Sequence, residues 1–334
     1  MTIPISSGTM STRLRSLAAP GVFALLCVAW GSGWLALKIG VAALPPLFFA
    51  ATRFVAAGTV LLVALAAKGE LGRLRDEGML LTLPGALLMV AVNYGLMAWG
   101  ATRATSGLAA VVNLTTVPLA MAIFGAIYGR ARLGRRTGIA LVMGSSGLAV
   151  LLLLPALAGT SVAGASAAST AVGLAAISVG AACYAWGSIL IRRRTTEIPA
   201  LAASTFQALA GGYALLVVSA LVEPWDSIPA AFADPVRLAG WLFLVAISVL
   251  STPAYLWLLA RWEPTRVAAY AYICPVIAVC EGVAFGGERI TITEIAGALL
   301  LGLGAYWALG QARTDGHRDA ARKEVGTPGD QITS

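Results

Sequence analysis

The chain alternates between long apolar stretches and short polar segments. The apolar stretches are about 20 residues long and show no strict alternation of apolar and polar positions. A helix of that length spans a hydrocarbon core of roughly 30 Å, whereas a barrel strand would appear as an alternating segment of ~10 residues. The pattern predicts about ten transmembrane helices, at residues 19–37, 46–67, 79–100, 107–128, 133–155, 171–191, 201–222, 237–259, 266–286 and 292–311.

Composition supports a membrane protein. Of the 334 residues, 59% are hydrophobic and 11% are charged, against roughly 25% charged residues in soluble domains. Backbone groups in lipid must bond within their own segment, so the sequence predicts an all-α fold. The net charge of +8 does not indicate nucleic acid, because the basic residues lie in loops between apolar spans rather than on one face of a domain.

The distribution of basic residues predicts the orientation. With the N-terminus in the cytoplasm, 18 of the 23 Lys and Arg residues fall on the cytoplasmic side, four fall outside, and Arg53 lies within a span. Basic loops stay in the cytoplasm, so this bias predicts an even number of spans with both termini inside. We expect a multi-pass protein of the cell's inner (plasma) membrane.

Two sequence patterns recur at nearly the same spacing. The segment Cys27-x-x-Trp30-Gly31-Ser32 recurs 156 residues later as Cys183-x-x-Trp186-Gly187-Ser188. Pro118 follows Thr116-Val117 in the fourth predicted span, and Pro275 follows Ile273-Cys274 in the ninth, an offset of 157. The repeat predicts two related halves of five helices. Because five is odd, the second half would cross the membrane in the opposite sense, as in many secondary transporters.

The predicted organisation has five parts. They are a cytoplasmic tail (1–18), the first five-helix repeat (19–155), a linker rich in Ala, Gly, Ser and Thr (156–170), the second repeat (171–311) and a disordered cytoplasmic tail (312–334). Small residues in the fifth and tenth spans, Gly144, Gly147, Gly297 and Gly304, indicate close helix contact. That contact could lie within one chain or between two, so monomer and homodimer both stay open.

The chain lacks the residues that several kinds of chemistry require. No Gly-x-x-x-x-Gly-Lys-Ser/Thr sequence occurs, so the chain has no P-loop of its own. The single histidine, His317, lies in the polar tail, and no aspartate falls in a predicted span. The four cysteines form no Cys-x-x-Cys pair. We therefore expect no catalytic site, metal or cofactor, and do not expect an enzyme.

Short motifs, in order along both halves, resemble a known family. They are Ala29-Trp30-Gly31-Ser32, Lys38-Ile39-Gly40, Pro45-Pro46, Arg53-Phe54, Ser106-Gly107-Leu108-Ala109-Ala110 before Pro118, and Ala271-Tyr272-Ile273-Cys274-Pro275-Val276 before Gly286-Gly287-Glu288. Over nearly all of residues 22–311, the chain resembles the EamA-type transporters of the drug/metabolite transporter superfamily. The resemblance implies a ten-helix carrier that exports amino acids, other metabolites or drugs. Arg130 departs from the acidic residue often found before the fifth helix.

Aromatic and polar residues inside the spans are the candidates for solute contact. Trp30, Trp34 and Lys38 share one face of the first span, and Trp30 lies too deep to be an interface anchor. Trp30 and its repeat partner Trp186 are therefore expected to line a cavity, with packing as the alternative. The candidate substrate-binding residues are Trp30, Trp34, Asn93, Tyr94, Asn113, Thr116, Trp186, Tyr255 and Tyr270.

Arg53 and Glu281 are the two ionisable residues well inside predicted spans. Both lie roughly 8–10 Å from the outer surface at ~1.5 Å per residue. Charges at such depth face a cavity or pair with each other. Contact with substrate or protons and a buried ion pair both stay open. Pro118 and Pro275 remove backbone donors within spans, and we interpret them as hinges or as simple bends.

These features predict a secondary active transporter that exports amino acids or related small organic metabolites by alternating access. The alternative is a carrier or exchanger of sugar-type, phosphorylated or drug-like solutes. Few intramembrane basic residues argue against a dianionic solute, since phosphates are usually held by two or more. A scaffold without transport is a third hypothesis. The expected partners are a small organic solute and membrane lipid, with protons as a candidate coupling ion and no nucleic acid.

Overall fold

A computed structural model gives the fold of most of the chain. The structure describes residues 9–128, 135–158, 166–194, 199–226, 228–259, 269–289 and 295–303, together with Trp262, Val267, Thr291, Ile292 and Tyr306. The first eight residues, Arg130, residues 159–165 of the predicted linker and the tail from residue 312 lie outside these residues. Within the described part every regular element is helical, as the apolar pattern predicted.

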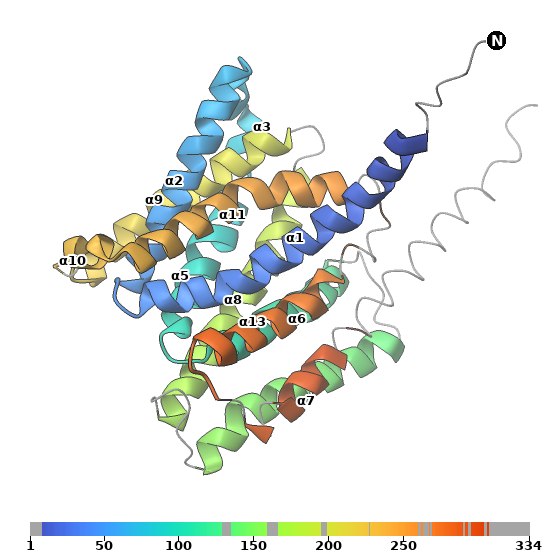
Figure 1. Ribbon diagram of the computed structural model, residues 1–334, viewed down its shortest axis with the longest axis vertical. Helices are drawn as coiled ribbons and strands as arrows, with labels where there is room; N and C mark the ends of the chain where they lie inside the picture. Colours follow the sequence, from blue (N-terminus) through green and yellow to red (C-terminus); the bar gives the residue numbers. More distant parts are fainter. Residues whose placement is uncertain are drawn as a thin grey trace, which may run out of the picture.

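Long helices make up the fold (Figure 1). They are α1 (Thr9–Val41), α2 (Pro46–Ala67), α6 (Ser106–Ile127), α7 (Arg135–Ala158), α8 (Ala167–Arg194), α9 (Ala200–Val222), α11 (Pro235–Leu259) and α13 (Tyr270–Phe285). Residues 295–303 form a further helical segment. Seven helices of the described chain are long and apolar enough to cross a membrane, and α13 and Val142–Leu151 of α7 are shorter apolar helices.

The predicted span 79–100 is not one regular helix. A 3-10 turn, Leu71–Arg75, and a short α3, Glu77–Leu80, precede it. The span itself begins at α4, Leu83–Ala86, where Pro84 occupies the first turn, the place in a helix that tolerates proline. A π-helical turn, Leu87–Val92, then leads into α5, Asn93–Ala101. Such a turn rotates the residues that follow it and is frequent at functional sites.

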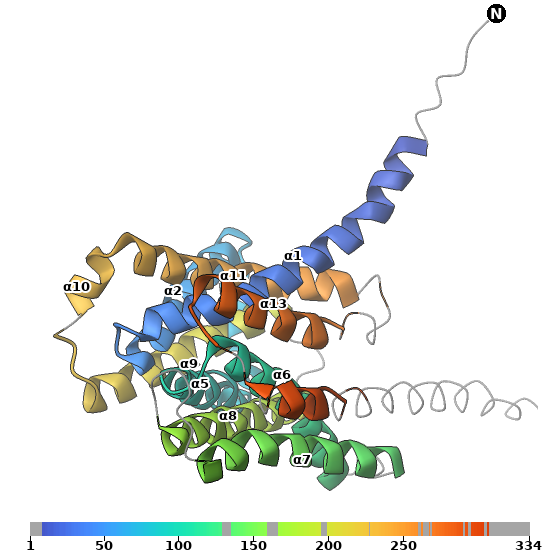
Figure 2. The ribbon, with the colours of Figure 1, turned by 60° about the horizontal axis from the view of Figure 1, so that its bottom comes forward.

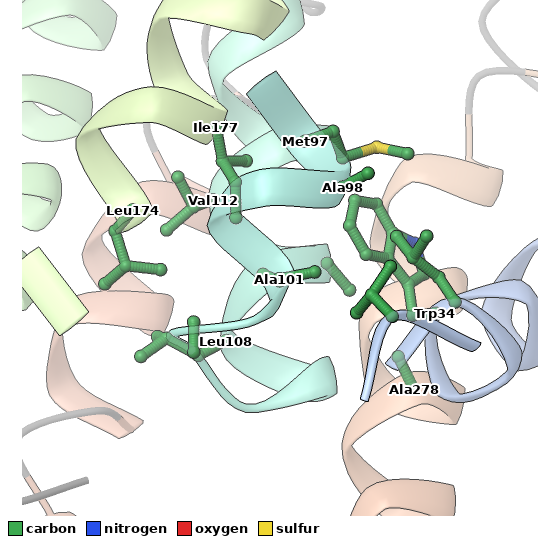
Figure 3. Close-up of a cluster of buried hydrophobic side chains, with 14 of the residues drawn as sticks. Trp34, Met97, Ala98, Ala101, Leu108, Val112, Leu174, Ile177 and Ala278 are labelled. Atoms are coloured by element: carbon green, nitrogen blue, oxygen red, sulfur yellow. The ribbon is translucent and has the colours of Figure 1, made fainter. Parts of the chain in front are cut away.

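Helices from the two halves of the chain pack against one another. The helix α2 lies along α9, and α6 lies beside α13. Similarly, α1 packs on α11 and α13, while α8 packs on α5 and α6. Figure 2 shows α7 at the outside of the bundle, next to α8. The side chains between these helices form an apolar core in which Trp34, Met97 and Ala98 meet (Figure 3).

Glycine allows two of these contacts to be close. A Cβ atom at Gly212 of α9 would lie 3.0 Å from the backbone nitrogen of Val55 in α2. On α7, a Cβ at Gly147 would lie 2.5 Å from the backbone nitrogen of Leu301 and 2.9 Å from the carbonyl oxygen of Gly297. The close contact predicted between the fifth and tenth spans is therefore confirmed within this chain at Gly147 and Gly297.

Two carboxylates tie helix starts to helix ends. Glu223, just after α9, accepts hydrogen bonds from the backbone nitrogens of Leu47 and Phe48 in the first turn of α2, both at 2.9 Å. Glu288, just after α13, accepts from the backbone nitrogen of Ser106 at 2.6 Å and from its hydroxyl at 2.9 Å, in the first turn of α6. The first N–H groups of a helix lack partners within it, so a carboxylate there is stabilising.

Lys38 makes the converse contact at the same end of the bundle. Its ammonium group donates to the carbonyl oxygens of Ala101, at 2.9 Å, and Ala104, at 2.6 Å, where α5 ends. A cation at a helix C-terminus is stabilising because the last carbonyl groups are unpaired and carry partial negative charge. We refer to these starts of α2 and α6, with the ends of α1, α5, α9 and α13, as the tied end.

Candidate substrate cavity

A cavity of about 350 Å³ lies inside the bundle. Its lining comes from α1, α2, the π turn with α5, α6, α8, α9, α11 and α13. On α2 the lining begins at Arg53, seven residues after the helix starts at Pro46, whereas on α9 it lies at Ser204–Ala208, close to the helix start at Ala200. On α1, by contrast, the lining reaches Leu37, near the end of that helix at Val41, so the cavity extends through the middle of the bundle. Both halves of the chain contribute to it.

Arg53 is the one charged side chain among the described residues that line this cavity. It is 5% exposed, and its guanidinium carbon lies 4.6 Å from the ring centre of Phe54 and 4.7 Å from that of Tyr94. Its Nε has no hydrogen-bond partner in the described part of the chain. A cation over an aromatic face gains about 0.5–2 kcal/mol, which offsets only part of the cost of removing the charge from water.

Two amides of the cavity also have unused polar atoms. Asn93 of α5 is 4% exposed and Asn113 of α6 is 9% exposed, and both line the cavity. The side-chain oxygen of Asn93 and the side-chain nitrogen of Asn113 have no hydrogen-bond partner among the described residues. Buried polar groups are nearly always paired, so unpaired ones that face a cavity are typical of a site that a ligand or water completes.

Aromatic side chains form one wall. The ring centres of Trp30 and Tyr270 are 4.5 Å apart, at an interplanar angle of 71°. Tyr255 lies 5.9 Å from Trp30 and 6.1 Å from Tyr270 by the same measure, so the three rings contact one another. Edge-to-face packing of this kind holds rings rigidly and gives a preformed apolar surface. Trp30 and Tyr270 line the cavity directly, and Tyr255 contacts both rings without being among the lining residues.

Most of the sequence-predicted residues meet in this cavity. Those that line it are Trp30, Trp34, Arg53, Asn93, Tyr94, Asn113, Pro118 and Tyr270. Trp34 is also part of the apolar core, so it serves packing as well. Thr116 is not among the lining residues, and its hydroxyl oxygen is buried without a partner in the described part of the chain.

Trp186 is not among the residues that line this cavity, although its repeat partner Trp30 is. The side chain of Trp186 is 39% exposed, stacks on Phe124 and donates to the hydroxyl of Tyr128 at 2.8 Å. Tyr184, two residues earlier on α8, lines the cavity instead. Residues two apart on a helix face nearly opposite directions. The motif repeats, but the face of the helix that meets the cavity does not.

Arg53 and Glu281 do not form an ion pair in this structure. Glu281 accepts a hydrogen bond from the Ser32 hydroxyl at 2.7 Å and is not among the cavity-lining residues. The expected pairing rested on equal depth, but α13 packs on α1 and α6, whereas α2 packs on α9 and α11. Two residues at equal depth in the membrane do not contact each other when their helices are not close neighbours.

Pro275 is buried and lines a second, largely apolar hollow of about 510 Å³ between α6, α13 and residues 295–303. Pro118 lies in α6 at the central cavity. The two prolines, equivalent in the repeat, therefore border different hollows.

Several polar residues of the cavity are not in the candidate set given above, although Gln207 is a weaker candidate from its place inside a predicted span. These are Tyr184, Ser204, Gln207, Ser248 and Ser251. Ser204 with Gln207, and Ser248 with Ser251, are each three residues apart and so share a helix face. That spacing was the available signal for a polar stripe on α9 and on α11. Tyr184 had no comparable signal, because its repeat counterpart, Val28, is apolar.

Comparison with known proteins identifies the family. The EamA-like transporter family matches this chain twice, over residues 19–153 and 171–310. The chain belongs to this family. It is 31% identical to a protein named "Uncharacterized inner membrane transporter YedA" from Escherichia coli K12, over 82% of this chain and 85% of that protein. It is 29% identical to a "Probable amino-acid metabolite efflux pump" of Salmonella typhimurium, over 84% and 91% of the two chains.

A solved structure supports the fold. A crystal structure with 21% sequence identity superposes with a TM-score of 0.57 and covers 89% of this chain and 98% of the other. The EamA-like match confirms the resemblance seen in the short motifs, and with the apolar helices it identifies the chain as a membrane transporter. Its relatives are transporters, one of them named for the inner membrane. The family implies a small solute as substrate.

Proposed function

We propose that this protein is a secondary active carrier that exports amino acids or related small organic metabolites through the central cavity. The observation that carries the proposal is a cavity at the junction of the two halves, where buried polar groups and an aromatic wall face one space. Small-molecule sites are mostly apolar with a few convergent polar groups. The names of two relatives, each a probable amino-acid metabolite efflux pump, favour this solute class.

The proposed architecture is ten helices in two inverted halves with both termini in the cytoplasm. The two separate matches to the family support it. The packing does so as well, since α1 contacts α11 and α13 just as α8 contacts α5 and α6. With this orientation the tied end faces outward, where the hydrogen bonds of Glu223 and Glu288 hold the helices together, so a solute would enter the cavity from inside the cell. Rocking of the two halves about the cavity would then open it to the outside.

A topology assay tests the orientation. Reporter fusions after Lys68, Arg136 and Arg194 are expected to give a cytoplasmic signal. Fusions within 163–170 or after Asp226 are expected to report the outside. A cytoplasmic signal from 163–170 would contradict the inverted arrangement.

A matched pair of tryptophan variants tests transport through the cavity. Trp30→Ala removes part of the aromatic wall and is expected to reduce solute flux in proteoliposomes at least tenfold, with little change in protein yield. Trp186→Ala is the control, because this ring lies outside the cavity and is already 39% exposed. The solutes to screen are amino acids and related metabolites first, then sugar-type, phosphorylated and drug-like compounds. Equal flux through both variants would refute the cavity as the transport site.

A further inference from the structure

We propose that the cavity selects organic monoanions, that is, solutes with one carboxylate on an apolar body, and that Arg53 binds the carboxylate. The inference rests on the proposed function of the cavity as the solute site and narrows its substrate class. It concerns which charged group of a small metabolite the protein recognises. An amino acid carries both an ammonium and a carboxylate, and the described lining provides a charged partner for the carboxylate alone.

The first support is the charge balance of the site. The described residues that line the cavity include one formal positive charge, Arg53, and no Asp or Glu. Arg53 is only 5% exposed, and its Nε is unpaired in this part of the chain. An unpaired charge inside a membrane protein is unfavourable and usually marks a substrate pathway. A carboxylate is the partner whose geometry matches a guanidinium best, because two parallel hydrogen bonds can form.

The second support comes from the neutral groups. The Asn113 amide nitrogen is a buried donor without a partner among the described residues, and it faces the same cavity. A second donor of this kind stabilises an anion without adding charge. Trp30, Tyr94 and Tyr270 supply an apolar wall for the rest of the solute. The volume, about 350 Å³, lies near the lower end of the range of roughly 300–1,000 Å³ for small-molecule sites.

Other charge types fit less well. A phosphate dianion usually requires two or more basic groups, and the described lining has one. An ammonium group could stack on the rings near Trp30, but it would share the cavity with the like charge of Arg53. A zwitterion gains at its carboxylate and must satisfy its ammonium with neutral acceptors such as the Asn93 oxygen. We therefore expect affinity to fall from monoanion to zwitterion and neutral solute, with the cation weakest.

Four probes with one carbon skeleton test this order. They are 3-phenylpropionate, phenylalanine, 3-phenylpropanol and 3-phenylpropylamine, which differ chiefly in charge. Dissociation constants are measured by calorimetry on the full chain in nanodiscs at neutral pH. The monoanion is expected to bind at least tenfold more tightly than the neutral alcohol, and phenylalanine more weakly than the monoanion.

Arginine variants assign the preference to one side chain. Arg53→Met is expected to abolish the tenfold preference, and Arg53→Lys to keep part of it. Arg103→Met is the matched control. The guanidinium carbon of Arg103 lies 3.6 Å from the ring centre of Trp99, and this arginine is not among the residues that line the cavity. If Arg53→Met fails to fold, the ranking of the four probes on the native protein and the result for Arg53→Lys still decide whether Arg53 causes the preference for the monoanion.

Three results would overturn the inference: equal or tighter binding of the zwitterion or the cation, an anion preference that persists in Arg53→Met, or no binding of any probe. These results differ from a failure of the proposed function. A flat charge ranking, together with flux that depends on Trp30, would leave the carrier intact and remove only its anion selectivity. If solute flux through Trp30→Ala equals that of the native protein, the cavity is not the transport site.

Discussion

Glu288 provides a direct measure of how firmly the tied end is held. Its carboxylate accepts from the Ser106 backbone nitrogen at 2.6 Å, from the Ser106 hydroxyl at 2.9 Å and, more weakly, from the Gly107 backbone nitrogen at 3.4 Å. These contacts join the end of α13 to the start of α6, across 182 residues of sequence. Replacing Glu288 by Ala removes all of them at once and leaves the first N–H groups of α6 without this partner.

The expected loss follows from the type of bond. A hydrogen bond to a charged group contributes about 1.5–3 kcal/mol net, and loss of a helix N-terminal cap costs about 0.5–2 kcal/mol. The two contributions overlap, because the same N–H groups are involved in both. We therefore expect Glu288→Ala to lower the free energy of unfolding by about 2–3 kcal/mol. Glu288→Gln keeps an acceptor oxygen but loses the charge. We expect it to lower the free energy of unfolding by about 1 kcal/mol, because the hydrogen bonds become weaker and the interaction with the helix dipole is lost.

Thermal unfolding of the detergent-solubilised protein measures the effect. The order of melting temperatures should be native, then Glu288→Gln, then Glu288→Ala, with the last several degrees below the first. Arg289→Gln is the control, because Arg289 is the neighbouring residue and its side chain is exposed. If Glu288→Ala melts within about one degree of the native protein, the carboxylate does not hold α6 as we infer.

Two further variants probe coupling and packing. If Glu281, which accepts from Ser32 at 2.7 Å, carries protons, Glu281→Gln should exchange solute normally across proteoliposomes but lose accumulation driven by a pH gradient. Accumulation at the native level would exclude that role. Gly147→Ala places a methyl group against the backbone of Leu301 and Gly297, which cannot move aside as a side chain can. We expect lower folded yield and melting temperature than for Gly138→Ala, a site on the same helix with no atom within 4 Å. Equal stability of the two would show that α7 and residues 295–303 tolerate separation.

The sequence predicted where helices lie better than how they face. The span expected at 46–67 is α2, Pro46–Ala67, and the one expected at 201–222 is Ala200–Val222. Apolar length and flanking prolines determine such bounds. The π turn at Leu87–Val92 could not be predicted, because it depends on packing: Val90 there lies against Gly211 of α9. The ten-helix count and the inverted repeat remain predictions.

The candidate site shows the same division. Arg53, Asn93 and Asn113 were identified because polar groups are costly inside a membrane, and that cost does not depend on which helices are neighbours. Trp186 and Glu281 were expected from the repeat and from depth, and the structure places them elsewhere. Both depend on helix rotation and helix neighbours, which are set by packing between the two halves.

The guanidinium of Arg53 is also an electrical element of the protein. It is a formal charge enclosed by rings rather than neutralised by a carboxylate of the described lining. Moving one elementary charge through a membrane potential of 100 mV changes the free energy by about 2.3 kcal/mol. In any step that shifts Arg53 along the field, the potential therefore acts on the empty carrier. A bound monoanion cancels the charge, so voltage would set the rate of the unloaded return step and leave the loaded step nearly unaffected.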